Sequence, residues 1–176
     1  ATISYDNGLE ADHQELIHCK GLHLDGTPEV ATSLGLHYFH PKYWFFDVNV
    51  NYFTNTYLDF NPVRRTDKAI AGLNPAVEAD AVLIDRITRQ ERLNGGVTVD
   101  ASIGKSIRID YKYYLNINLS ATNILNNRTL KTGGYEQSRF STINSNTDRA
   151  TYLDRFPPKY FYAYGATIYL NVGFRF

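Results

Sequence analysis

The segment YFYAYGATIYLNVGFRF, from Tyr160 to Phe176, indicates the fold class because its side chains alternate in polarity. Every second position from Tyr160 is mostly aromatic or aliphatic, and the positions between are mostly small or polar. A period of two is typical of a β-strand with one apolar face. The run has about seventeen residues, more than the roughly 9–11 that a tilted strand needs to cross a bilayer. We therefore predict a membrane-spanning strand whose lipid-facing residues are Ile168, Leu170, Val172, Phe174 and Phe176.

The same alternation recurs upstream, so the sequence predicts about six strands. They cover residues 14–24, 30–38, 43–60, 97–109, 113–121 and 160–176. In the second strong run, Trp44 and Phe46 lie on one face and Asp47 and Asn49 on the other. Such a polar face cannot belong to a dry core, because unpaired buried polar groups are costly. Lys105 interrupts an apolar face, which predicts either a bulge or a membrane boundary there.

The connections between these strands are alternately short and long from Pro41 onward. Tight turns are expected at 25–28, 40–42 and 110–112, whereas 61–96 and 126–158 are long polar loops. The first loop is predicted to carry one amphipathic helix that starts at Asn74-Pro75 and stops at Asn94-Gly95-Gly96. The apolar stripe predicted for this helix consists of Val77, Ala81, Ile84 and Thr88.

Short periplasmic turns and long extracellular loops are typical of bacterial outer-membrane barrels. The sequence therefore predicts an all-β fold, an antiparallel transmembrane β-barrel with one short loop helix and extracellular loops at 61–96 and 126–158. The smallest natural single-chain barrels have about eight strands, and this chain offers about six. Either two strands near the N-terminus escape the pattern, or the chain is the C-terminal part of a larger barrel.

Composition excludes several function classes. The 18 Lys and Arg residues balance the 18 Asp and Glu residues, so nothing indicates a nucleic-acid partner. The sequence has no apolar run long enough for a membrane helix and no recognisable catalytic or phosphate-loop motif. Cys19 is the single cysteine, and it would point away from its neighbour His18 on a strand, so no metal site is expected. We expect neither enzymatic activity nor a cofactor.

Two polar clusters are candidate contact sites for a ligand or a protein partner. The richer one follows a Gly-Gly turn in the second loop and contains Tyr135, Glu136, Gln137 and Arg139. Its side chains could bind an imported ligand or a surface lipoprotein, or they could order the loop through internal ion pairs. Arg64 and Arg65, like the arginines at 86, 89 and 92, could bind an anionic ligand or lipopolysaccharide phosphates, or form a solvated ion-paired face.

Several blocks of the sequence resemble the TonB-dependent outer-membrane receptors of Bacteroidetes-type bacteria. They lie at 49–66, 89–109, 123–127 (NILNN), 130–140 and 156–176, in the order in which the family has them. The resemblance implies that the chain supplies the C-terminal strands of a barrel of about 22 strands in the outer membrane of a Gram-negative bacterium. It also implies active import of a scarce nutrient ligand.

The partners implied by this resemblance are the remainder of the barrel, an N-terminal plug, the TonB system acting through that plug, and outer-membrane lipid. The plug and the TonB-contacting segment do not occur in this sequence. An alternative reading is a self-contained β-barrel or sandwich that binds carbohydrate or peptide through exposed tyrosines. In that case the apolar strand faces would pack against each other instead of against lipid.

Overall fold

The computed structural model describes residues 2–5, 13–17, 19–139, 143 and 145–176, which form mainly antiparallel β-strands and two α-helices. The chain divides into two compact units. The sheet unit comprises residues 28–56, 93–132 and 161–176. The loop unit comprises the described residues of 1–27, 57–92 and 133–160.

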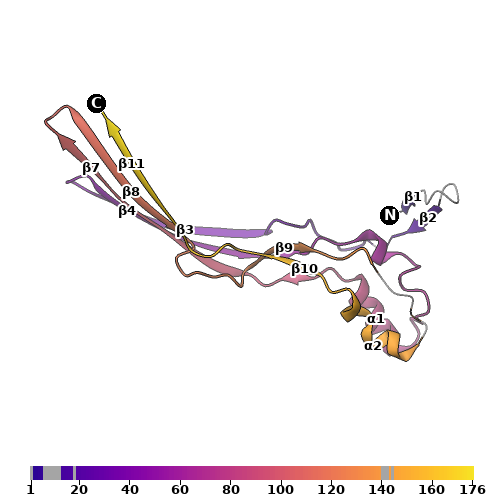
Figure 1. The fold of residues 1–176 in the computed structure, drawn as a ribbon. Coiled ribbons are helices and arrows are strands. Elements are labelled where there is room, and N and C mark those ends of the chain that lie inside the picture. Colours follow the sequence, from indigo (N-terminus) through magenta and orange to yellow (C-terminus); the bar gives the residue numbers. More distant parts are fainter. Residues whose placement is uncertain (1, 6–12, 18, 140–142, 144) are drawn as a thin grey trace. The chain divides into compact units, whose positions relative to one another are not determined.

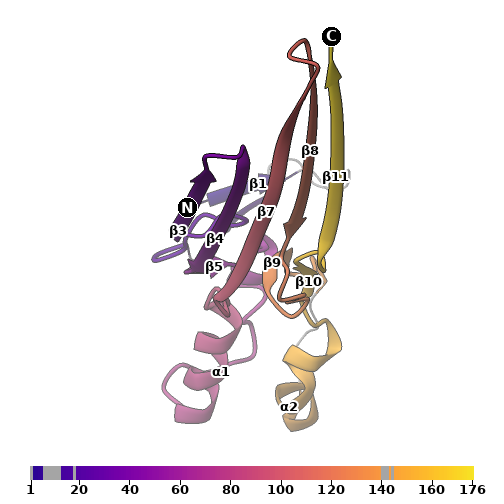
Figure 2. The ribbon, with the colours of Figure 1, turned by 90° about the vertical axis from the view of Figure 1, so that its left-hand side faces the viewer.

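The sheet unit is one antiparallel sheet of five long strands (Figure 1). In spatial order these are β11 (Thr167–Arg175), β8 (Tyr113–Thr122), β7 (Gly96–Ile109), β4 (Trp44–Thr54) and β3 (Val30–His40). Figure 2 shows β7, β8 and β11 running side by side along most of their length. Among the described residues this sheet is open, with β3 and β11 at its edges.

Tight turns join β3 to β4 and β7 to β8, as predicted. The Tyr43 N–H donates to the His40 carbonyl at 2.9 Å, with Tyr43 at a φ of 61°. Asp110 and Tyr111 both have positive φ, at 49° and 58°, which is the pattern of a type I′ hairpin turn. Of the two alternatives predicted at Lys105, the bulge is wrong, because the β7–β8 ladder runs through this residue without a break. The Lys105 ammonium instead lies 4.5 Å from the centre of the Trp44 ring, in a cation–π contact.

The predicted single strands at 160–176 and 43–60 are wrong, because both are interrupted. β10 (Lys159–Tyr162) ends before residues 163–166, and β11 begins after them. There the Ala166 N–H donates to the Asn126 side chain at 3.0 Å instead of continuing a ladder. Asn55, at a φ of 57°, likewise separates β4 from the short β5 (Thr56–Tyr57), which pairs with β6 (Arg92–Leu93).

The loop unit contains more regular structure than the sequence predicts. Its elements are β1 (Thr2–Tyr5), β2 (His13–Leu16), the 3₁₀ helix η1 (Pro62–Arg65), α1 (Glu78–Thr88) and α2 (Asn146–Arg155). β9 (Lys131–Tyr135) pairs with β10. The strand predicted at 14–24 ends at Leu16, and His18 lies outside the described residues. The prediction of one loop helix is wrong, since α2 is a second one.

The predicted helix at 74–94 exists, but its bounds and its buried face differ. An Asx-type turn occupies Asn74 to Val77, so α1 begins only at Glu78. The buried side chains are Asp80, Leu83 and Ile87, not the predicted stripe. Leu83 and Ile87 pack with Ile143 and Tyr152 in a small apolar core, and that packing partner is distant in sequence. Asp80 accepts hydrogen bonds from Arg149 of α2, the shorter at 2.8 Å.

Candidate functional site

One face of the sheet unit is apolar across all five strands. The ladders align every strand so that its apolar positions fall in rows. One complete row consists of Tyr38, Phe46, Ile103, Leu119 and Leu170. These five side chains are between 40% and 60% exposed, so no described residue covers them. Within the described part of the chain, the face therefore lacks the packing partner that an apolar surface of this extent requires in water.

The predicted lipid-facing residues of the terminal strand extend these rows. Ile168, Leu170, Val172 and Phe174 stand opposite Ala121, Leu119, Ile117 and Leu115 of β8, and all four are more than half exposed. Phe176 lies beyond the end of β11 and has no partner in the ladder. The phase of the alternation was thus readable from the sequence, although the length of the strand was not.

The opposite face of the same sheet is polar and internally hydrogen-bonded. The Asn51 amide donates to Asp100 on β7 at 2.9 Å and its oxygen accepts from Ser33 on β3 at 2.8 Å. Nearer the hairpins, Asp47 accepts from Ser102 at 2.9 Å and contacts His37. These bonds run across three neighbouring strands, so the face is suited to contact with water rather than with a second sheet.

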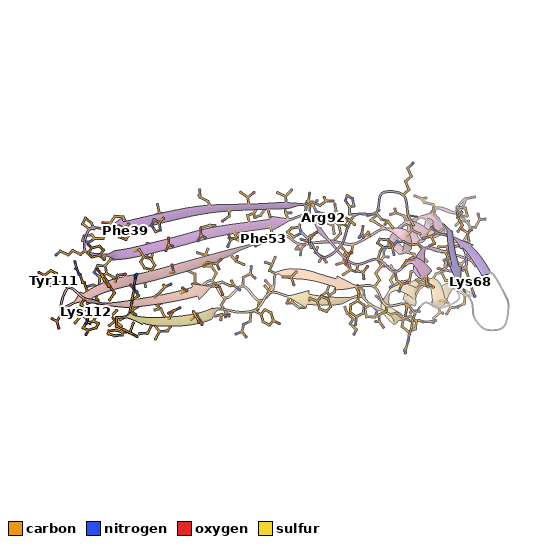
Figure 3. The ribbon with its side chains drawn as sticks, turned by 90° about the horizontal axis from the view of Figure 1, so that it is seen from above. Phe39, Phe53, Lys68, Arg92, Tyr111 and Lys112 are labelled. Atoms are coloured by element: carbon orange, nitrogen blue, oxygen red, sulfur yellow. The ribbon has the colours of Figure 1, made fainter. Side chains whose placement is uncertain are left out.

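Aromatic residues gather where the strands meet the hairpin turns. Trp44 and Tyr38 lie at this end of the apolar face, and the rings of Tyr113 and Phe174 stack with centres 5.7 Å apart. Figure 3 shows Phe39, Tyr111 and Lys112 at this end of the sheet and Phe53 toward the other. Tyr52 marks the apolar face near that second end. An apolar band with aromatic borders is typical of membrane strands.

The NILNN turn after β8 is hydrogen-bonded to β7 and to the segment that precedes β11. The Asn123 amide donates to the Tyr164 carbonyl at 2.7 Å and to the Asn127 carbonyl at 3.1 Å. Its backbone N–H donates to Asp100 at 2.8 Å, and its side-chain oxygen accepts from the Asn127 N–H at 3.1 Å. Asn123 is 6% exposed with a φ of 48°, a conformation that asparagine tolerates better than most residues. This motif is one of the five blocks that resemble the receptor family, and here its hydrogen bonds order the backbone around the end of β8.

In the loop unit, Arg65 and Glu136 form a buried ion pair. Arg65 is 0% exposed, and both of its terminal nitrogens donate to the Glu136 carboxylate in a bidentate arrangement. The remaining N–H groups donate to the carbonyls of Asn61, Thr88 and Arg89 at 3.0–3.3 Å. The guanidinium thus ties η1, the end of α1 and the segment after β9, and leaves no N–H for a ligand. For these two residues the geometry corresponds to internal ordering of the loop.

The other residues of the predicted Tyr135 cluster lie around one polar cavity of about 510 Å³. Its lining residues are Asp59, Asn61, Tyr135, Glu136, Gln137, Ser138, Arg139 and Lys159. Gln137 is held by a bond from its amide to the Pro157 carbonyl at 2.7 Å. Burial, together with the nearby negative charges of Asp25 and Glu136, raises the pKa of Asp59 above its usual value. The cavity therefore combines donors, acceptors and one aromatic ring, a set suited to hydroxyl-rich ligands.

Arg64 faces a different cavity from Arg139, so the predicted contact residues do not form one site. Arg64 is buried and lines a cavity of about 320 Å³ together with Arg86 and Arg89, whereas Arg92 lines another. Sequence reasoning missed the Asp80–Arg149 pair and the role of Asn123. A capping signal for α2 was present, since the Ser145 hydroxyl accepts from the Asp148 N–H at 3.1 Å.

Comparison with known proteins identifies no relative: no family model, no curated protein and no solved structure matches the chain. No helix in the described part of the chain is long and apolar enough to span a membrane. Within the same residues, no three His, Cys, Asp or Glu side chains lie close enough together to hold a metal ion.

Proposed function

We propose that this chain forms C-terminal strands of a TonB-dependent outer-membrane receptor that imports a nutrient ligand. The observation that carries the proposal is the two-faced sheet, with an uncovered apolar face in register across five strands and a hydrogen-bonded polar face behind it. Lipid would cover the first face, and a water-filled or plugged lumen would meet the second. The open edges at β3 and β11 would pair with the remaining strands of the barrel.

The connectivity of the sheet supports the same topology. Both tight turns lie at one end, and the two long connections, from β4 to β7 and from β8 to β11, leave from the other end. In an outer-membrane barrel the turns would be periplasmic and the segments 57–92 and 133–160 extracellular. The cavity beside Tyr135 would then contact cargo or a surface lipoprotein, and coupling to TonB would pass through the plug of the complete receptor.

A self-contained sandwich that binds carbohydrate or peptide receives less support. Such a fold needs a second sheet or a helix layer over the apolar face, and in the described residues the row from Tyr38 to Leu170 stays exposed.

Trp44 provides a direct test, because it is the only tryptophan of the chain and lies on the apolar face. In the complete barrel, with any other tryptophans replaced, its fluorescence should be quenched by brominated lipid and protected from aqueous acrylamide. The matched control moves the probe to the polar face with Trp44→Phe and Phe39→Trp, because Phe39 lies beside it in the adjoining strand. In this control, the fluorescence of the tryptophan introduced by Phe39→Trp should be quenched by acrylamide and not by brominated lipid. Equal quenching of the two probes by brominated lipid would contradict the proposal.

A further inference from the structure

Arg64 is a buried cation that forms no ion pair with any of the described residues. It is 5% exposed, yet the only hydrogen bond that its side chain makes to the described residues joins Nη1 to the Phe156 carbonyl at 3.3 Å. The Nε of Arg64 is also buried, and no described residue accepts a hydrogen bond from it. The neighbouring Arg65, in contrast, is fully compensated by Glu136. Removing a charge from water without a partner is costly, so the environment of Arg64 favours an added anion.

The cavity beside Arg64 is positively charged at its wall and large enough for a small ligand. Its volume is about 320 Å³, and Arg86 and Arg89 of the α1 region line it together with Arg64, although Arg89 is already paired with Asp85. Of the two carboxylates in the lining, one pairs with a cation, and the other accepts from a neutral hydroxyl that does not neutralise its charge. Glu136 binds Arg65, and Glu91 accepts hydrogen bonds from the Tyr160 hydroxyl at 2.8 and 3.0 Å.

We propose that this cavity binds a phosphate group, with Arg64 as the buried countercharge and Arg86 as an exposed second contact. Guanidinium groups from separate positions suit the tetrahedral oxygens and double charge of phosphate better than a planar carboxylate. The phosphate could be carried by a free phosphate ester or by a lipid A headgroup. The proposal concerns the loop unit alone and does not depend on the transport assignment.

Titration calorimetry on the full chain tests the site, with inorganic phosphate as one probe and detergent micelles containing lipid A as the other. Arg64→Gln should weaken phosphate binding about tenfold or more, since it removes charge-assisted contacts. Arg86→Gln, at an exposed position, should weaken it less. The control is Arg155→Gln on α2, because Arg155 pairs with Asp148 and does not line the cavity; its affinity should stay unchanged.

The two probes distinguish the sources of the phosphate. Binding of inorganic phosphate supports a soluble ester, and Arg64-dependent binding of lipid A alone supports the headgroup. The proposal is overturned if neither probe binds, or if a folded Arg64→Gln chain binds as tightly as the original. Should Arg64→Gln fail to fold, unchanged phosphate and lipid A binding by Arg86→Gln overturns it instead.

Discussion

Comparing Leu170→Arg with Asn171→Arg tests whether lipid or water covers the apolar face of β11. The two positions are adjacent in the middle of β11, so strand propensity and depth nearly cancel between them. Leu170 stands opposite Leu119 on the apolar face and is 60% exposed. Asn171 stands opposite Asn118 on the polar face, and the Asn118 side-chain oxygen is buried without a hydrogen-bond partner in the described residues.

The expected magnitudes follow from these surroundings. If lipid covers the apolar face, Leu170→Arg should cost roughly 2–4 kcal/mol near the bilayer midplane, about thirtyfold or more in the folding equilibrium. If water covers it, replacing an exposed leucine should change stability by only about 0.5 kcal/mol. Asn171→Arg should be nearly neutral in either case, because it gains donors that can reach Asn118.

The assay is folding of the complete barrel into lipid vesicles, followed by electrophoretic mobility and by urea titration of the folded fraction. We expect Leu170→Arg to reduce folding strongly and Asn171→Arg to assemble like the original protein. Equal tolerance at the two positions would refute the lipid-facing assignment of β11, and with it the main support for the transport proposal.

Three further predictions use matched pairs of residues. Asn123→Asp should destabilise the sheet unit by about 2–3 kcal/mol, since it leaves two carbonyls without donors. Asn126→Asp should be nearly neutral, because the Asn126 side chain accepts hydrogen bonds from Ala166 and Arg128. The midpoints of urea unfolding compare the two variants. Glu136→Gln should lower the free energy of unfolding by about 3–5 kcal/mol, because it leaves Arg65 buried without a countercharge. Asp85→Asn breaks an exposed pair with Arg89 and should lower it by less than about 1 kcal/mol in the same titration. Hydrogen bonds from Arg149 and the Asn74 N–H lower the pKa of Asp80, so its carboxylate stabilises the fold above the usual aspartate pKa, and this stability is lost as the pH falls through the lowered value. Burial raises the pKa of Asp59, so its ionised carboxylate destabilises the fold at pH 7. Asp59→Asn should therefore raise thermal stability at pH 7, whereas Asp80→Asn should lower it.

The sequence predicted those features of the fold that local chemistry determines. Polarity alternation predicted the phase of the five strands in the sheet unit, and the turns at Pro41 and Tyr111 lie where the sequence placed them. The interruption at 163–166 could not be predicted locally, because it depends on Asn123 and Asn126, about forty residues earlier in the chain. Each residue of the interruption continues the alternation, and only the side-chain bonds from the turn end the ladder.

The loop unit was less predictable for the same physical reason. α2 has little apolar surface, and Tyr152 is its one buried side chain, so periodicity could not reveal it. Its position depends on Arg149 reaching Asp80, a contact between residues 69 positions apart. The buried face of α1 was also misassigned, because the core that selects it includes Ile143 and Tyr152 from the distant segment.

Among the predicted site residues, the number of side-chain donors already bonded within the protein distinguishes a structural role from a binding role. A charged side chain whose donors are all satisfied internally, as in Arg65, can be removed only at the cost of stability. A charged side chain that is buried with donors to spare, as in Arg64, imposes a cost that a ligand can relieve. Two adjacent arginines in one 3₁₀ helix therefore differ in what their substitution should do: loss of Arg65 should unfold the loop unit with or without phosphate. Loss of Arg64 should reduce the stabilisation that phosphate adds, and comparing the two thermal midpoints with and without phosphate separates the roles.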